Sequence, residues 1–486
     1  MKNNSLRNFS VRLIFALALV TASVAAQQVI PPQNPLTAAQ RLSLASGTSQ
    51  HERPQKAPGA AASRSEGMTL EELQQMALVN NPTLGQAKAG VNAATGRTRQ
   101  AGLWPNPTVG YVGEEIRGGS YGGGQHGVFI QQNVILGSKL DLDRKVRSEE
   151  GKQAVAEAEE QRLRVENGVR IAFYQSLAAQ QMLETRKTLS GIAEDAVDTA
   201  QQLFNVGQAD QPDLLQAQVE ADEADLAVIA AEQDQLRAWR VLTSVVGKPS
   251  MELTKLAGNL EDLPQIDADE VIETILRESP AVKIAQLESS RADVAFTRAH
   301  REVIPDLSVR AGYLNNREDV GTIPPMAVGS EGFAEVGLNL PIFNRNQGNI
   351  EAAKAERERA RFEVQRVSLS LRRLAAPVLQ SYSTSRSVVE RYKGRTLPNA
   401  QKAYDLYLHK YHEGAAAYPQ VLIAQRTLFQ LHIAYIGALE NAWMGTATLQ
   451  GLLLTDPLDL PAVPGELDRP VREINVPVVE TPGTPR

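Results

Sequence analysis

The chain has 486 residues, a formal net charge of −6 at pH 7 and only 5% aromatic residues. It has no cysteine, which excludes disulfides, thiol catalysis and cysteine metal sites. The acidic balance argues against nucleic acid as a partner. Because Ala, Gln, Glu and Arg dominate the middle of the chain, we expect long helices with narrow apolar seams rather than thick globular cores.

Residues 1–26 have the form of a secretory signal peptide. Lys2, Arg7 and Arg12 are followed by the apolar run 13–20 and by small residues before the expected cleavage site. A retained membrane anchor is the alternative, which the shortness of the apolar run disfavours. Cleavage would remove three positive charges and take the formal charge from −6 to −9.

Two copies of one unit, 69–250 and 268–455, lie between the ends of the mature chain. Residues 27–67 are rich in Ala, Pro, Gln and Ser and are expected to form a flexible leader, and 456–486 hold seven prolines and are expected to form an extended tail. A period near 200 residues is too long for a solenoid, so it indicates a duplicated domain.

Each copy is expected to begin with a short helix, capped by Thr69 or Asp267. A second helix follows at about 83–103 or 281–302. It ends in a proline signal, WPNP in the first copy and IPD in the second.

Two short runs in each copy alternate apolar and polar residues, which predicts strands with one apolar face. They span 108–115 and 127–133 in the first copy, and 307–314 and 333–340 in the second. Four strands are too few to close a barrel, and an open sheet edge is not tolerated in lipid. If the strands cross a membrane, several chains must pool them, and three chains would supply twelve.

Arg310 and Glu335 test this interpretation. Each lies out of phase with the apolar residues of its strand. On the lipid side an arginine would cost about 2–4 kcal/mol at mid-membrane. We therefore expect both side chains to face the lumen.

The long stretch 138–205 has no proline, and 68 helical residues would extend roughly 100 Å. A helix of this length must belong to a coiled coil or a similar packed array. The helices that follow each turn carry the same heptad seam. Its members are Ala217, Ala221, Ala224, Val228, Ala231, Gln235, Ala238, Leu242 and Val245, and, 207 positions later, Ala424, Leu428, Leu431, Tyr435, Ala438, Ala442, Gly445, Leu449 and Leu452.

Both long helices are interrupted at the same internal period, by FNVGQADQPDLLQAQ and by YHEGAAAYPQVLIAQ. Gly207 and Gly414 are suited to positive φ, and the prolines that follow suit the first turn of a new helix. We interpret 205–212 and 412–419 as the turns of two helical hairpins, with Asp210 as a candidate N-cap. A kink in one continuous helix is the alternative.

Sixteen residues before the tip glycines stand Gly191 and Pro398, where we predict that the helices bend. Nearer the second tip, His409 and His412 lie three apart, with Asp405 one turn earlier. Two imidazoles and a carboxylate can bind Zn²⁺ or a similar ion, but a polar surface near a turn is the alternative. The carboxylates are otherwise interleaved with Arg and Lys, so we predict neither an enzyme nor a cofactor.

Over 69–455 the chain resembles the TolC-type outer-membrane efflux proteins. The resemblance rests on the duplication, on AGLWPNPTVGY, NVILGSK and LNLPIFNRNQGNIEAAKAE, and on both glycine tips. The wording of WPNP and LPIFNRNQGNI is most similar to the CzcC-like branch, whose pumps usually export heavy-metal cations.

The resemblance implies a mainly α fold with a membrane β-barrel: a homotrimer whose twelve-stranded barrel in the outer membrane of a Gram-negative bacterium continues as a periplasmic α-helical barrel. The tips would meet a periplasmic adaptor (membrane fusion) protein coupled to an inner-membrane pump of RND type, and the duct itself would be passive. A duct for drugs or for type I protein secretion is an alternative. A periplasmic coiled-coil adaptor or structural protein without a barrel is another, but it leaves the four strands unexplained.

The resemblance also implies that polar residues just past each tip glycine close the entrance. Asp213 matches a position that is often Asp. Gln420 and Ile423 stand where relatives commonly place two aspartates, which puts a cation-binding acid ring in doubt. Asp210 and Asp213 are then the candidates for polar contacts at the entrance.

Overall fold

The computed structural model describes residues 67–114, 116, 124–320 and 326–459. All of these belong to one compact unit, Arg64–Arg486. The expected signal peptide, almost all of the leader and most of the tail lie outside the described residues.

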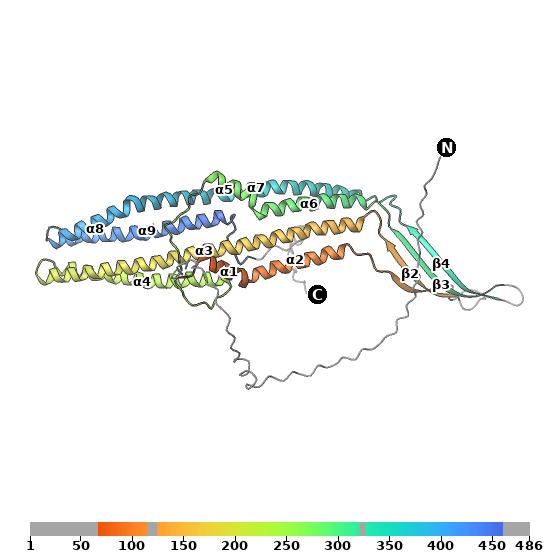
Figure 1. Ribbon diagram of the computed structural model, residues 1–486, viewed down its shortest axis with the longest axis horizontal. Helices are drawn as coiled ribbons and strands as arrows, with labels where there is room; N and C mark the ends of the chain where they lie inside the picture. Colours follow the sequence, from red (N-terminus) through yellow and green to blue (C-terminus); the bar gives the residue numbers. More distant parts are fainter. Residues whose placement is uncertain (1–66, 115, 117–123, 321–325, 460–486) are drawn as a thin grey trace, which may run out of the picture. The chain divides into compact units, whose positions relative to one another are not determined.

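The helices repeat in the same order in the two copies (Figure 1). The first copy contains α1 (Leu70–Asn80), α2 (Pro82–Ala101), α3 (Lys139–Asn205) and α4 (Gln211–Val246); the second contains α5 (Ala268–Glu278), α6 (Pro280–Arg301), α7 (Gln347–Arg391), the π-helical turn η1 (Tyr392–Thr396), α8 (Leu397–His412) and α9 (Tyr418–Gln450). Within the described residues, none of these helices is both long and apolar enough to cross a membrane.

The first helix of each copy begins at the expected cap. Thr69 forms a capping box with Glu72 at the start of α1. At the start of α5, one Asp267 carboxylate oxygen accepts hydrogen bonds from the N–H groups of Asp269 and Glu270, at 2.9 and 3.0 Å. The two copies therefore begin alike with different residues.

Both copies contribute to a single antiparallel sheet of order β1-β2-β3-β4. Its strands are β1 (Thr108–Glu114), β2 (Gln125–Val134), β3 (Leu307–Val320) and β4 (Met326–Leu338). The central pair, β2 and β3, joins the copies. Within the described residues, β1 and β4 each have one edge without a strand neighbour.

The second pair of strands is longer than the alternation indicates. β3 continues to Val320 and β4 begins at Met326, with an irregularity in the register between Asn316 and Asp319. In β3 the alternation ends at the polar run 315–319, although the backbone ladder continues. At the other end β4 stops at Leu338, before Pro341, whose nitrogen cannot donate to a ladder.

The predicted heptad seam faces the interior of the helical bundle. All of its residues are buried or half-buried, from Ala217 to Val245 in α4 and from Ala424 to Leu452 in and just beyond α9. The largest core cluster unites α1, α3, α4 and α9 around Phe173, Leu242 and Leu439. A second core cluster fills the tip region, between the two hairpins.

A bend is expected at both Gly191 and Pro398, but the α-helix is interrupted only next to Pro398. α3 continues as one helix through Gly191, whereas η1 directly precedes Pro398. A proline ring clashes with the carbonyl four residues earlier, here that of Gly394. The π turn relieves this clash, since the N–H of Leu397 donates to the carbonyl of Tyr392, five residues back.

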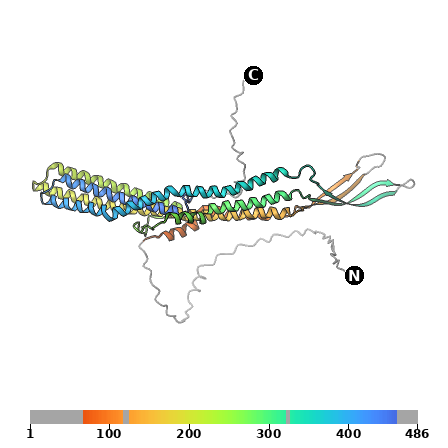
Figure 2. The same cartoon turned by 90° about the horizontal axis from the view of Figure 1, so that it is seen from above.

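The two tips are hairpin turns, at the end of the helices remote from the strands (Figures 1 and 2). φ is +76° at Gly207 and +68° at Gly414. In the first turn the N–H of Gln208 donates to the carbonyl of Leu203, and in the second the N–H of Ala415 donates to that of Lys410, both at 2.8 Å. These bonds are 207 residues apart and form the same glycine-terminated helix end.

Replacing either tip glycine with alanine tests the role of positive φ. No atom lies within 4 Å of a Cβ built on Gly207 or Gly414, so only the backbone conformation opposes a side chain there. We expect Gly207→Ala and Gly414→Ala each to destabilise their turn by about 1–2 kcal/mol. Amide hydrogen exchange of the adjoining helical turns would measure the loss.

Gly348→Ala is the matched control, because Gly348 lies in the first turn of α7, also has open space, and lacks positive φ. Alanine there should leave exchange unchanged or slow it. Equal exchange in all three variants would contradict the role assigned to the tips.

Candidate functional site

The sheet has one apolar and one polar face. The register places Val109, Val128, Ile130, Tyr313, Val336 and Leu338 on the same face. Each of them is at least half exposed, from 50% for Tyr313 to 73% for Val109. An apolar face this exposed on four strands indicates a surface that lipid or another chain covers.

The opposite face holds Arg310 and Glu335, which are direct partners in the ladder between β3 and β4. Their charged groups approach to 3.8 Å. The guanidinium also lies over two aromatic rings of this face, 4.2 Å from the ring centre of Phe129 and 5.5 Å from that of Phe333. A charge in this arrangement is stabilised by cation–π contacts as well as by its carboxylate partner.

The two phenylalanine rings lie flat on the sheet because glycines stand beneath them. A Cβ on Gly110 would lie 2.6 Å from the ring of Phe129, and one on Gly312 would lie even closer to the ring of Phe333. Any larger residue at either glycine would push a ring off the sheet.

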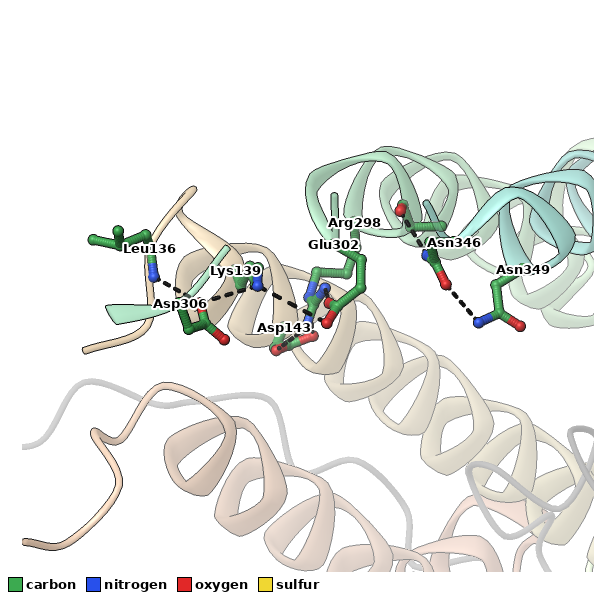
Figure 3. Close-up of polar contacts among 9 residues, drawn as sticks. Leu136, Lys139, Asp143, Arg298, Glu302, Asp306, Asn346 and Asn349 are labelled. Carbon is green, nitrogen blue, oxygen red and sulfur yellow. Dashed lines mark hydrogen bonds and ion pairs between the residues drawn. The ribbon is translucent and has the colours of Figure 1, made fainter. Parts of the chain in front are cut away.

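A cluster of ion pairs joins the two copies where the strands meet the helices (Figure 3). The buried Lys139 ammonium donates to Asp306 at 3.0 Å and lies 3.9 Å from Glu302. Arg298 bridges Asp143 of the first copy and Glu302 of its own helix. This end of α3 is therefore fixed against α6.

Asp306 has its pKa held down by this cluster. Burial raises the pKa, but the N–H of Leu136 and the ammonium of Lys139, both 3.0 Å from one carboxylate oxygen, together lower it below its ordinary value. The carboxylate thus stays ionised and links the end of β2 to the start of α3.

Both long helices begin at a residue in the left-handed conformation. φ is +58° at Ser138, before α3, and +59° at Asn346, before α7. Asn346 donates from Nδ2 to the carbonyl of Ala299 at 2.8 Å and accepts from Asn349 at 2.6 Å (Figure 3). The sequence signals NVILGSK and LNLPIFNRNQ thus use the same left-handed backbone conformation at the strand-to-helix transition.

At the other end of the helices, tyrosines fill the space between the two hairpins. The rings of Tyr411 and Tyr418 have centres 5.5 Å apart and pack with Leu214 and Tyr404. Burial raises the pKa of both Tyr411 and Tyr418. Their hydroxyls are buried and have no hydrogen-bond partner among the described residues.

An ion pair ties the first hairpin to the second just beyond this tyrosine core. Arg426 of α9 reaches both carboxylate oxygens of Glu220 in α4, with Nε 3.0 Å from Oε2 and a shorter contact from Nη2 to Oε1. Neither residue is noticeable in sequence, because single Glu and Arg residues are common on helix faces.

The candidate entrance residues occupy different surroundings. Asp210 is the N-cap residue of α4, but its side chain makes no capping hydrogen bond. Asp213 is half-buried beside the tyrosine core. Gln420 and the 66% exposed Ile423 instead line a shallow groove of about 250 Å³ between α8 and α9.

The candidate metal ligands near the second tip are not brought together. Asp405 accepts a hydrogen bond from Gln401 at 2.9 Å, and His409 lies 3.3 Å from Glu413. Among the described residues no group of three or more His, Cys, Asp or Glu side chains is placed to hold a metal ion. Asp405 and His409 thus each have a partner on their own helix.

Comparison with known proteins identifies the architecture. The family model described as "Outer membrane efflux protein" matches residues 73–248 and 271–453, more than half of the chain. The matched segments coincide with the two copies. A solved structure of CusC matches with a TM-score of 0.66 and 17% identity, covering 83% of this chain and 98% of that one.

Three relatives are similar in sequence over most of their length. The cobalt-zinc-cadmium resistance protein CzcC of Cupriavidus metallidurans is 28% identical over 388 residues, 79% of this chain and 90% of CzcC. Protein CyaE of Bordetella pertussis is 28% identical over 427 residues, 82% and 87%. The cation efflux system protein CusC of Escherichia coli is 26% identical over 381 residues, 74% and 80%.

The family and its solved neighbours are channel proteins, and the exposed apolar sheet face agrees with a membrane location. The chain belongs to the outer membrane efflux protein family and is an exit duct in the outer membrane.

Proposed function

We propose that this duct carries heavy-metal cations out of the cell as the last part of a tripartite pump. The observation that carries the proposal is the match to CzcC over 90% of that protein's length, since its name specifies cobalt, zinc and cadmium resistance. The cation efflux protein CusC supports the same cargo class. The chain contributes a passage, with no catalysis and no cofactor of its own.

We propose a homotrimer as the working unit. The edges of β1 and β4 need partners in lipid, and three copies would close twelve strands. α4 supports assembly, because it exposes a second apolar stripe on the side away from its seam. That stripe consists of Leu215, Val219, Leu226 and Ile229, each about half exposed or more. Four exposed apolar side chains on one helix face are suited to contact with a neighbouring helix.

The partners would be a periplasmic adaptor at the helical tips and an inner-membrane pump of RND type that supplies the energy. The polar face of the sheet, with Arg310 and Glu335, would line the lumen, and the apolar face would meet outer-membrane lipid. Both tips would form the entrance, with Gly207 and Gly414 setting their turns and Asp210, Asp213, Gln420 and Ile423 around them.

Deleting the gene tests the cargo. We expect the deleted strain to accumulate cobalt, zinc or cadmium, and re-expression of this chain to restore export, measured as cellular metal content. Export of a drug or of a secreted protein is the second candidate, supported by the similarity to CyaE, whose name specifies no metal. Unchanged metal content with a rise in retained drug would overturn the metal proposal and leave the duct intact.

Neighbouring residues of β4 test the orientation of the sheet. Val336→Arg places a charge on the apolar face, where it would cost about 2–4 kcal/mol at mid-membrane, so less trimer should assemble. Gly337→Arg is the matched control on the opposite face, where a built Cβ meets only Ser308 at 4.0 Å, and it should assemble normally. Heat-modifiable trimer in the outer-membrane fraction measures both, and equal assembly would refute the assigned faces.

Contacts at the first tip are proposed to hold the entrance closed. Asp213 is half-buried beside Tyr411 and Tyr418, whereas Gln420 is exposed. We therefore expect Asp213→Ala to increase the single-channel conductance of the resting duct, and Gln420→Ala to leave it unchanged. The reverse order would assign the closure to the second tip.

A further inference from the structure

Large apolar side chains are exposed beside both outer edges of the sheet. Leu103 and Trp104, just before β1, are 53% and 57% exposed. Leu340, Ile342 and Phe343, just after β4, are 61%, 60% and 92% exposed. Two such residues beside one edge and three beside the other give each edge an exposed apolar surface, which is typical of a contact site.

The topology brings these two surfaces together when two chains associate edge to edge. Strands alternate in direction through the order β1-β2-β3-β4, so β1 of the next chain would lie antiparallel to β4. In an antiparallel pair the start of one strand lies beside the end of the other. The segment before β1 of one chain must therefore approach the segment after β4 of its neighbour.

A cavity of about 530 Å³ lies where this approach would occur. Its walls include Ile304, Pro305 and the segment from Asn339 to Asn344, and Lys139 and Asp306 contribute to its lining. The ion pairs of Lys139 with Asp306 and Glu302 hold this side rigid (Figure 3). A lining of mixed apolar and polar residues suits an indole ring, which combines a broad apolar surface with one N–H donor.

The segment after β4 is held in place before any partner arrives. The N–H of Ile342 donates to the carbonyl of Leu340 at 2.9 Å, and that of Arg345 donates to Gln347 Oε1 at 2.8 Å. The backbone N–H of Asn346 donates to Asn344 Oδ1 at 3.0 Å. A surface ordered in advance loses little conformational entropy on association, which favours docking over a disordered contact.

We propose that Trp104 of each chain docks between Ile342, Phe343 and the adjoining cavity of the next chain. This contact, at the helical end of the sheet, is called the lock below. The proposal rests on the closure of the sheet between copies described above. It adds the residues that fix the joint on the helical side of the sheet.

Paired cysteines test the lock directly, because the natural chain has none. We expect the double variant Trp104→Cys and Phe343→Cys to give a covalent three-chain product on mild oxidation, seen by non-reducing electrophoresis. Val79→Cys with Phe343→Cys is the matched control, since Val79 is 84% exposed on α1. Intact trimers without cross-linking in the first pair would overturn the lock.

The native chain supplies a second measurement, which does not depend on the variants folding. Of its three tryptophans, Trp239 and Trp443 are 3% and 8% exposed, so Trp104 alone can report on the surroundings of the sheet. We expect its fluorescence in trimers to resist quenching by brominated phospholipid. Strong quenching would show that lipid covers Trp104 and would refute docking.

The same samples separate the lock from the proposed function. Trimers that conduct ions but show no cross-link and strong quenching would refute the lock alone. Failure to form trimers at all, with extraction among soluble proteins, would refute both.

Discussion

The outer edges of β1 and β4, which have no strand neighbour in the part of the chain that the structure describes, are the constraint on which the rest of the structure depends. A backbone N–H or C=O without a partner costs several kcal/mol in lipid, so four strands cannot remain open at both sides. The duplication supplies only two strands per copy, joined through β2 and β3. In the proposed homotrimer the remaining pairs come from other chains, which would make the assembled duct, rather than the single chain, the folded unit.

The transition from sheet to helices imposes the second constraint. Side chains repeat every two residues in a strand and every 3.6 in a helix, so the chain must reset its direction in between. Ser138 and Asn346 do so with the same left-handed backbone, although one copy uses a short connection and the other a longer one. The Lys139–Asp306 pair then binds the two transitions to each other, so strands and helices cannot shift independently.

Features that follow from local backbone rules could be predicted from the sequence. The turns at Gly207 and Gly414 and the heptad seam are of this kind, since positive φ and helical spacing leave a mark in consecutive residues. Contacts between distant residues leave none. The pair of Glu220 with Arg426 is one such contact. Glu157 is another case: it is 5% exposed, and its carboxyl oxygen Oε2 has no hydrogen-bond partner among the described residues. Burial, with Glu160 nearby, raises the pKa of Glu157 to about 7. The metal-binding role of Asp405, His409 and His412 stays a prediction; the partners of Asp405 and His409 on their own helix, Gln401 and Glu413, are contacts that spacing alone does not reveal.

The glycines beneath Phe129 and Phe333 have a consequence for the width of the passage. Each ring lies against the wall only because Gly110 or Gly312 leaves room for it. In the proposed trimer, any side chain at these two positions would push two rings per chain toward the axis, and six rings would then crowd the same level. On the proposed orientation of the sheet, Gly110 and Gly312 would thereby limit how far the rings project into the passage, and so how large a cargo could pass.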